Sequence, residues 1–375
     1  MAKPMADRDR HDEPALVLRG LRKRYGEATA VDGVDLEVRR GEFVTLLGPS
    51  GSGKTTTLRM IAGFTVQDVG SIEIGGEDMG RVPPHRRDVG MVFQNYALFP
   101  HMTAAQNVAF PLQMRRLSRS EQKARVAEVL ALVRLESLGD RYPRQLSGGQ
   151  QQRIALARAV VFEPRLLLMD EPLGALDKKL RESLQLEILR ISRQLGATTV
   201  YVTHDQEEAL VMSDRIAIFD RGRIQQMGSG EDLYERPTSL FVADFIGESN
   251  ILRGTFARNG DGGWLIRASW RWRVDGVGLA GRDIADGPAA LVVRPEHLRV
   301  EPLDAPLAGG RNAIDATVTE VLYLGPSRKI ELALPDGQIA VERESAGVGR
   351  DWRPGERVRL SWATTDGVVV DDGGS

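Results

Sequence analysis

The sequence of 375 residues contains no cysteine, which excludes disulfide bonds and any zinc or iron–sulfur site built on thiolates. It has only five histidines, scattered along the chain, and this argues against a histidine-rich metal site. No run of about 18 apolar residues occurs, so we expect no membrane-spanning segment. Residues 1–13 are polar and lack the apolar centre of a secretory signal peptide. We expect a disordered tail there, and a cytosolic protein unless a partner holds it at a membrane.

An excess of charge of one sign is also missing. The formal net charge is −2, with 50 basic and 52 acidic residues, so charge offers no argument for binding nucleic acid or a lipid surface. The hydrophobic content of 42% is that of a soluble globular protein, and the length predicts about two or three domains. All five tryptophans lie beyond residue 250, which indicates a second domain of different character.

The clearest motif is a glycine-rich loop that fits the phosphate-binding P-loop pattern, Gly48-Pro49-Ser50-Gly51-Ser52-Gly53-Lys54-Thr55-Thr56. Glycines let successive backbone N–H groups turn toward phosphate oxygens. Lys54 can reach the β- and γ-phosphates of a nucleotide, and the Thr55 hydroxyl can bind Mg²⁺. An apolar run precedes the loop and a helical pattern follows it, which disfavours a glycine-rich turn without a ligand. The motif therefore predicts binding of a nucleoside triphosphate.

Strand-like and helical segments alternate around this loop, which predicts an α/β core with a largely parallel sheet. Residues 165–169 are apolar enough for a central strand buried on both faces. Between about residues 95 and 160 the period becomes helical, with a capping box at Ser118 and Glu121, so we expect a helical insert there. The candidate strands are residues 16–18, 36–38, 43–47, 72–74, 89–93, 165–169, 198–203 and 215–219.

An acidic pair, Asp170 and Glu171, directly follows the predicted central strand, at the position of a Walker B motif. Asp170 would hold Mg²⁺ through water, and Glu171 would orient or deprotonate the attacking water as a general base. Neighbouring strand residues point to opposite faces, so the two carboxylates can take different roles. A solvated surface pair is the alternative, and it is disfavoured because a buried strand directs the pair toward the P-loop edge of the sheet.

The octapeptide Leu146-Ser147-Gly148-Gly149-Gln150-Gln151-Gln152-Arg153 supplies a second motif. On its own, Ser147 could simply cap the helix that follows, and such a helix start also favours an anion such as a γ-phosphate. The octapeptide resembles the signature motif of ATP-binding cassette (ABC) proteins. The chain is similar to this family from residue 15 to about residue 245.

The resemblance implies roles for further residues. Tyr25 stands where ABC proteins stack an aromatic ring on adenine, and Gln94 where a glutamine contacts Mg²⁺ and the attacking water. His204 resembles the switch histidine at the γ-phosphate. Asp177 lies in the loop that crosses between subunits, where Gly174 replaces a serine common in the family. Tyr25, Gln94 and His204 could instead be ordinary packing or surface residues.

The implied cofactors are ATP and Mg²⁺. The implied catalytic residues are Lys54, Gln94, Glu171 and His204; the implied ATP ligands are Tyr25, residues 48–56, Ser147, Gly148, Gly149, Gln150 and Asp177; and the implied Mg²⁺ ligands are Thr55, Gln94 and Asp170. The signature motif of an ABC protein cannot reach the P-loop of its own chain. The resemblance therefore implies a head-to-tail homodimer that ATP holds together and that opens after hydrolysis.

Two features favour a transport function over the DNA-repair and translation functions of other ABC ATPases. The segment between Gln94 and Leu146 is too short for long coiled coils, and the balanced charge argues against nucleic acid. Residues 95–100 lie where importer ATPases dock a helix of a membrane subunit, although they could instead fill the core beneath the helical insert. A small-molecule kinase is disfavoured because the signature motif has no role in one.

Beyond residue 247, short alternating runs separated by glycine and proline turns predict an all-β barrel or sandwich. Residues 245–252 and 293–300 resemble the TOBE domain, an OB-like regulatory domain of bacterial solute importers. Its tryptophan and arginine strands could indicate a nucleic-acid binder, but core or dimer contacts explain the tryptophans more simply. We expect an ABC domain over residues 14–246 and a TOBE domain over residues 247–375.

The family that the chain resembles most is that of the ATPases of spermidine/putrescine importers, on residues 91–103 and 248–252. Importers of ferric ion, sulfate, phosphonate or sugar, and non-transport ABC ATPases, remain alternatives. The resemblance implies an ATP hydrolase at the cytoplasmic face of the inner membrane, beneath two integral permease subunits. A solute-binding protein would act on it only indirectly, and nucleic acid is not an expected partner.

Overall fold

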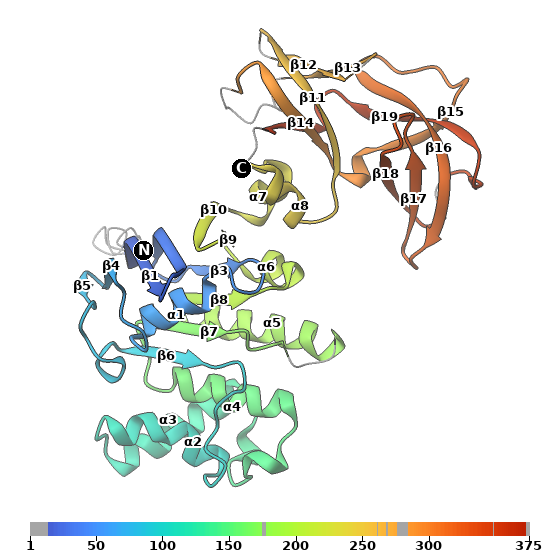
Figure 1. The fold of residues 1–375 in the computed structure, drawn as a ribbon. Helices are drawn as coiled ribbons and strands as arrows, with labels where there is room; N and C mark the ends of the chain where they lie inside the picture. The colour runs from blue at the N-terminus through green and yellow to red at the C-terminus, as the bar shows by residue number, and fades with distance from the viewer. Residues whose placement is uncertain are drawn as a thin grey trace, which may run out of the picture. The chain divides into compact units, whose positions relative to one another are not determined.

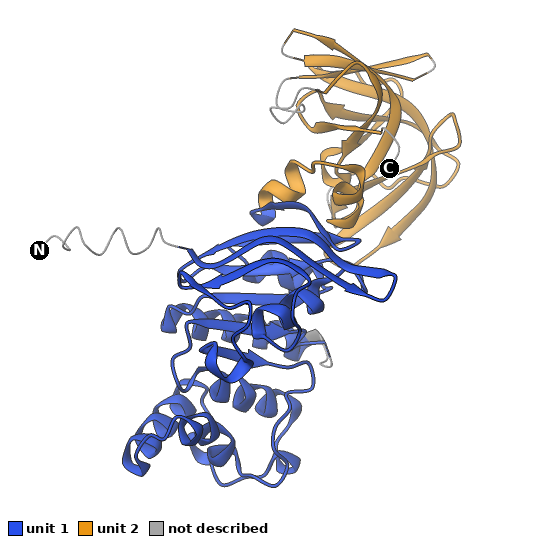
Figure 2. Cartoon of the chain, turned by 60° about the vertical axis from the view of Figure 1, so that its left-hand side comes forward, with its two compact units in different colours: residues 1–230 blue, residues 231–375 orange. Residues whose placement is uncertain are grey.

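The computed structural model describes residues 14–174, 178–260, 262–267, 269–275, 284–347 and 349–372. The tail predicted for residues 1–13 lies outside these ranges. Contacts divide the chain into two compact units, Met1–Gly230 and Glu231–Ser375 (Figure 2). Residues 231–246, which the sequence placed with the first domain, group here with the second unit. The domain limits drawn from the sequence stay a prediction.

Two sheets and a group of helices build the first unit (Figure 1). Its strands are β1 (Pro14–Tyr25), β2 (Ala28–Arg39), β3 (Phe43–Leu47), β4 (Val69–Ile74), β5 (Glu77–Asp78), β6 (Val89–Val92), β7 (Leu166–Asp170), β8 (Thr199–Thr203), β9 (Arg215–Asp220) and β10 (Arg223–Gly228). Its helices are α1 (Lys54–Ala62), α2 (Ala104–Met114), α3 (Arg119–Leu132), α4 (Gly148–Val160), α5 (Lys178–Leu195) and α6 (Gln206–Met212), with short 3₁₀ turns η2 (Pro84–Arg86), η3 (Glu136–Leu138) and η4 (Pro143–Gln145).

The larger sheet has six strands in the order β10-β9-β3-β8-β7-β6. Strands β9, β3, β8, β7 and β6 run parallel to their neighbours, and β10 pairs antiparallel at the edge. This confirms the predicted α/β core. The early strands do not join it: they form a separate antiparallel sheet in the order β2-β1-β4-β5.

Strand β7 is buried along its whole length, as predicted for a central strand. Leu166 and Leu168 belong to the core that also contains side chains of the antiparallel sheet and α1. Leu167 and Met169 belong to the core formed with helices α2 to α5. This alternation is that of a strand covered on both faces, and each such side chain contributes roughly 1.5–3 kcal/mol on burial. Two packed layers therefore hold the strand that carries the acidic pair.

Helices α2, α3 and α4 gather on the side of the sheet beyond β6 (Figure 1). Helix α3 begins at the predicted capping box: the Ser118 side chain accepts a hydrogen bond from the Glu121 N–H, and Glu121 accepts one from the Ser118 N–H. Ser147 and Gln150 form the same reciprocal pair at α4. Such a cap contributes about 1 kcal/mol and sets where the helix starts. No described helix is long and apolar enough to cross a membrane.

The second unit is mostly antiparallel β-structure. Its elements are α7 (Gly230–Glu235), α8 (Leu240–Phe245), β11 (Asn250–Asn259), β12 (Gly262–Arg267), β13 (Trp270–Val274), β14 (Gly287–Val293), η6 (Pro295–His297), β15 (Arg299–Pro302), β16 (Arg311–Tyr323), β17 (Ser327–Ala333), β18 (Ile339–Ser345), β19 (Arg357–Ala363) and β20 (Gly367–Asp371). Two five-stranded sheets, β13-β12-β11-β14-β20 and β15-β19-β16-β17-β18, share one core. Trp272, Trp352 and Trp362 are buried in it, which agrees with a core role for these tryptophans.

Arg294 attaches the two short helices of this unit to its β-structure. The side chain is 3% exposed and stacks over the Tyr234 ring, with 4.0 Å from the guanidinium carbon to the ring centre. It donates hydrogen bonds to the carbonyl oxygens of Tyr234 (2.6 Å) and Ala243 (3.0 Å). A planar guanidinium satisfies several carbonyls at once, so this one residue fixes α7 and α8 together.

Glu342 on β18 is a buried carboxylate whose Oε2 has no hydrogen-bond partner among the described residues. Burial and the nearby Glu344 raise its pKa from 4.5 to about 8, against the opposing effect of Arg328. Below pH 4.5 both the folded and the unfolded chain hold the proton. Above that pH the unfolded chain releases it first, so the free energy of unfolding falls as the pH rises toward 8.

We expect Glu342→Gln to remove this fall and to raise the free energy of unfolding above pH 8 by about 2–4 kcal/mol. The measurement is urea unfolding of the full chain from about pH 5 to about pH 9, followed by tryptophan fluorescence, since all five tryptophans lie in this unit. Glu320→Gln, at an exposed position on β16, is the matched control. An unchanged pH slope in Glu342→Gln would contradict the assignment.

Candidate functional site

The glycine-rich loop joins β3 to α1, so the predicted strand–loop–helix context is present. Two of its glycines are required by close packing. A Cβ at Gly48 would lie 2.3 Å from the Phe219 carbonyl oxygen. A Cβ at Gly53, whose φ is +105°, would lie 2.4 Å from the Ala30 carbonyl oxygen. Only glycine fits both positions, and the loop can therefore keep its tight turn.

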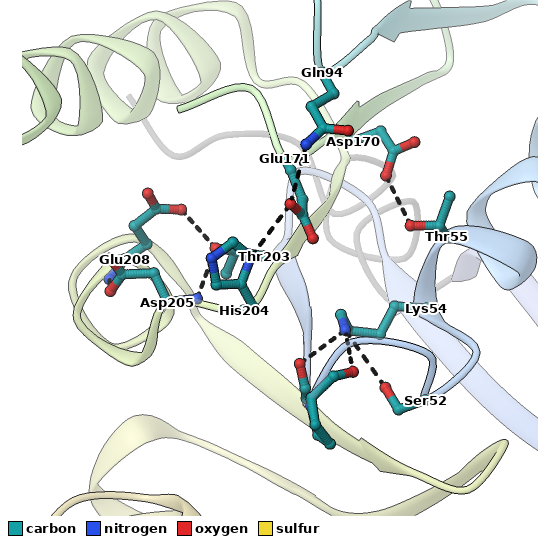
Figure 3. Close-up of polar contacts among 12 residues, drawn as sticks. Ser52, Lys54, Thr55, Gln94, Asp170, Glu171, Thr203, His204, Asp205 and Glu208 are labelled. Atoms are coloured by element: carbon teal, nitrogen blue, oxygen red, sulfur yellow. Dashed lines mark hydrogen bonds and ion pairs between the residues drawn. The ribbon is translucent and has the colours of Figure 1, made fainter. Parts of the chain in front are cut away.

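The Lys54 side chain folds under this loop. Its ammonium donates to the carbonyl oxygens of Gly48 (2.8 Å) and Pro49 (2.9 Å) and approaches Ser52 Oγ at 3.4 Å (Figure 3). Lys54 is 4% exposed, and burial lowers the pKa of its ammonium, an effect that Glu171 and Asp170 oppose. The positive charge is thus fixed at the centre of the loop, where an anion would contact it.

Thr55 and Asp170 face each other from the start of α1 and the end of β7. Thr55 Oγ1 donates to Asp170 Oδ1 at 3.1 Å. Asp170 is 8% exposed, and burial raises the pKa of its carboxyl, while the Thr55 hydrogen bond lowers it. Hydroxyl and carboxylate oxygens are ligands that Mg²⁺ prefers. The described residues hold no cluster of three or more His, Asp or Glu for a metal, so a cation here would take further ligands from phosphate or water.

Glu171 lies between two other predicted catalytic residues (Figure 3). Its Oε2 is 3.2 Å from His204 Nδ1 and 3.5 Å from Gln94 Nε2. Gln94 follows β6, Glu171 follows β7 and His204 follows β8, and these strands are neighbours in the parallel sheet. The carboxyl ends of parallel strands meet at one edge, which is where α/β proteins place their ligand sites.

The backbone of Glu171 adopts φ +44°, in the left-handed region. Its N–H donates to the Val202 carbonyl at 3.0 Å, which holds the residue against β8. A side chain in this conformation costs about 1–3 kcal/mol, and such strain is concentrated at functional positions. The strain therefore agrees with the predicted catalytic role of Glu171. The sequence pattern predicted that role but not the strained backbone conformation.

The other predicted site residues do not gather at this point. Ser147, Gly148 and Gly149 begin α4, and the described part of the chain has no hydrogen bond between them and the P-loop. Gly149 faces Leu180 and Leu184 of α5 instead. The start of α4 therefore packs against α5.

Tyr25 ends β1 and is 53% exposed, with the Lys23 ammonium 5.6 Å from its ring centre. The ring is accessible to a base, and its stacking on adenine stays a prediction. Asp177 lies outside the described residues, so its predicted part in the subunit-crossing loop stays a prediction.

Two buried polar side chains that the sequence analysis missed hold the loop of residues 95–103. Arg158 on α4 donates to the carbonyl oxygens of Tyr96 and Ala97, both at 2.8 Å, where φ is +59° and +46°. Asn107 on α2 is fully buried and donates to carbonyl oxygens of the same loop. The sequence does offer one sign of the Arg158 contact, because Arg158 is the one charged residue in the otherwise apolar second half of α4.

Comparison with known proteins agrees with this geometry. The family model described as ABC transporter matches residues 31–174, and the model described as TOBE domain matches residues 291–370. The spermidine/putrescine import ATP-binding protein PotA of Rubrobacter xylanophilus is 48% identical over 350 residues, covering 93% of this chain and 91% of that protein. The protein of the same name from Thermobifida fusca is 48% identical over 363 residues, covering 95% and 94%.

Among solved structures, the dimeric ATP-binding cassette MJ0796 in a post-hydrolysis state, bound to ADP and Pi, matches with a TM-score of 0.51 and 33% identity. The match covers 57% of this chain and 98% of that chain. The residues that the ABC transporter model matches include the P-loop, the acidic pair at the end of β7 and the signature motif at α4. The chain therefore belongs to the ABC transporter family of ATP-binding proteins, with a C-terminal TOBE domain.

Proposed function

We propose that this protein is the ATP-hydrolysing subunit of an ABC importer for the polyamines spermidine and putrescine. The observation that carries the proposal is the meeting of Lys54, Glu171 and His204 at the carboxyl edge of the parallel sheet. The polyamine assignment rests on relatives 48% identical over nearly the whole chain, which are named as spermidine/putrescine import proteins.

The chemistry of the chain's own residues follows from their positions. Backbone N–H groups of the loop and the Lys54 ammonium bind the phosphates of ATP. Glu171 orients the attacking water and takes its proton, while Gln94 and His204 hold the carboxylate in place from either side. Thr55 and, through water, Asp170 would hold Mg²⁺, and the ion would screen the phosphate charge. Tyr25 covers the adenine.

We also propose that two copies pair head to tail, so that the signature motif of each completes the site of the other. Three points support this. Ser147 and its glycines share no hydrogen bond with the P-loop within the described part of one chain. The helix that they start can direct N–H groups at a γ-phosphate. In addition, the similar solved cassette is a dimer bound to ADP and Pi.

Two permease subunits are the proposed membrane partners, docking near Gln94 to Pro100. An apolar groove of about 350 Å³ lies there, lined in part by Met91, Phe93, Phe99, Phe110 and Phe162. Such a groove can take the apolar face of a short helix. This contact would place the chain peripherally at the cytoplasmic face of the inner membrane. The solute-binding protein would then affect it only through the permease subunits.

The test is uptake of labelled putrescine and spermidine by cells that lack this gene and any second polyamine importer. We expect uptake to be lost, restored by the wild-type gene and not restored by Glu171→Gln. Uptake of an unrelated amino acid is the control and should not change. Unchanged polyamine uptake would contradict the solute assignment, and restoration by Glu171→Gln would contradict the requirement for hydrolysis.

A further inference from the structure

A buried carboxylate, Glu208 on α6, lies directly behind the turn that carries His204 (Figure 3). It is 3% exposed. Its Oε2 accepts hydrogen bonds from the Tyr201 hydroxyl and from Thr203 Oγ1, both at 2.7 Å. Burial raises the pKa of Glu208, and the hydrogen bonds from Thr203 and Tyr201 oppose this. Burying a carboxylate costs free energy unless hydrogen bonds or opposite charges compensate for it, so a carboxylate at this position indicates a specific role.

The hydrogen bonds continue from Glu208 to both neighbours of His204. The Thr203 hydroxyl, which donates to Glu208, also accepts from the Asp205 N–H at 3.0 Å. The Asp205 carboxylate then accepts from the Glu208 N–H at 3.2 Å and caps α6. Glu208 thus closes a ring of contacts around the turn of residues 203–205.

Helix α5 joins the same ring through Arg181. Its Nη1 donates to Asp205 Oδ2 at 3.0 Å, and its Nε lies 3.9 Å from Glu208 Oε1. Arg181 is in the first turn of the helix that follows the Glu171 loop in the sequence. The turn at His204 is therefore also held by α5.

The His204 side chain itself receives little support from packing, since it is 55% exposed. Its contact with Glu171 at 3.2 Å must therefore depend on where the backbone of residues 203–205 directs the ring. We infer that Thr203, whose hydroxyl joins the buried Glu208 carboxylate to the Asp205 N–H, is a positioning residue that fixes the turn and thereby holds His204 Nδ1 against the Glu171 carboxylate. The inference rests on the proposed function, because this pair matters only if the chain hydrolyses ATP.

Two hydroxyls donate to the same oxygen of Glu208. Removing them one at a time distinguishes a role in positioning His204 from a role in stability alone. Thr203 lies next to His204 in the sequence, whereas Tyr201 lies in the apolar core on the other side of the carboxylate. Thr203→Val and Tyr201→Phe each remove one hydroxyl from Glu208 Oε2. A purely structural role for the carboxylate predicts similar effects of the two variants. Positioning of His204 predicts that only the first affects the site.

The first measurement is steady-state ATP hydrolysis by the full chain. We expect Thr203→Val to lower kcat by about tenfold with KM within about twofold of wild type, because the loss is in alignment of the catalytic pair. Tyr201→Phe should keep kcat within about twofold, and Thr203→Ser, which restores the hydroxyl, should recover most of the kcat. Equal losses in Thr203→Val and Tyr201→Phe would overturn the inference, as would wild-type kcat in Thr203→Val.

The second measurement does not depend on hydrolysis. The imidazole NMR signal of His204 can be assigned among the five histidines by its absence in His204→Ala. We expect this signal to shift in Thr203→Val and to stay in place in Tyr201→Phe, and an unshifted signal in Thr203→Val would overturn the inference. A wild-type chain without ATPase activity would refute the proposed function instead, while the NMR comparison would still decide whether Thr203 places the ring.

Discussion

Replacing Glu171 by glutamine is expected to lower kcat for ATP hydrolysis by about 10²- to 10⁴-fold, the range usual for loss of a general base, while ATP still binds. The amide keeps the size of the carboxylate and can still face Gln94 and His204, but it cannot take a proton from water. The P-loop and Lys54, which bind the phosphates, are untouched. Hydrolysis should therefore stop at the ATP-bound state.

The measurements are phosphate release at saturating ATP and molecular size on a sizing column. Because ATP would persist between two chains, we expect Glu171→Gln to run as a dimer with ATP and as a monomer without it. Glu207→Gln makes the same chemical change at an exposed position near the site and should behave as wild type. A Glu171→Gln chain that stays monomeric with ATP would contradict the head-to-tail dimer, and one with wild-type hydrolysis would contradict the role of Glu171.

Removing the ammonium of Lys54 should have the largest effect on binding. Hydrogen bonds to charged groups contribute about 1.5–3 kcal/mol each, so losing two of them to phosphate in Lys54→Ala weakens ATP binding by about 100-fold or more. Hydrolysis falls below detection for the same reason. Lys54 is buried within the loop and donates to the Gly48 carbonyl oxygen, so its charge is held where the phosphates would bind.

Isothermal titration with ATP measures this loss, with circular dichroism to show that the variant is folded. Lys123→Ala, at an exposed position on α3, is the matched control and should bind ATP as the wild type does. Wild-type affinity in Lys54→Ala would show that the loop binds phosphate through its backbone alone.

Many residues at the carboxyl edge of the parallel sheet could be predicted because their positions depend on short stretches of sequence. A short apolar run specifies a buried strand, and the residue that follows such a strand must lie at the edge of the sheet. For this reason β3 and β7 appear within a residue of their expected positions, with Lys54 shortly after β3, Asp170 at the end of β7 and Glu171 directly after it. The predicted capping box at Ser118 and the predicted N-cap at Ser147 also depend only on residues close in sequence.

What could not be predicted depends on contacts between distant residues. The pairing of β1 with β2 and β4 in a separate sheet follows from packing over α1, and strand propensity does not encode it. Arg158 reaches carbonyl oxygens 61 and 62 residues away in the sequence, and no motif announces such a bond. Glu208 belongs to no sequence motif described above, and it is buried beside the His204 turn only because of the fold.

The position of β7 between two cores has a consequence for timing. A strand packed on both faces cannot open locally, because opening would disturb both cores at once, so its amides belong to the part of the unit that exchanges with solvent most slowly. Asp170 is the last residue of this strand, and Glu171 follows it directly. In the head-to-tail dimer proposed above, the two carboxylates would therefore already be in position when the signature motif of the second chain arrives.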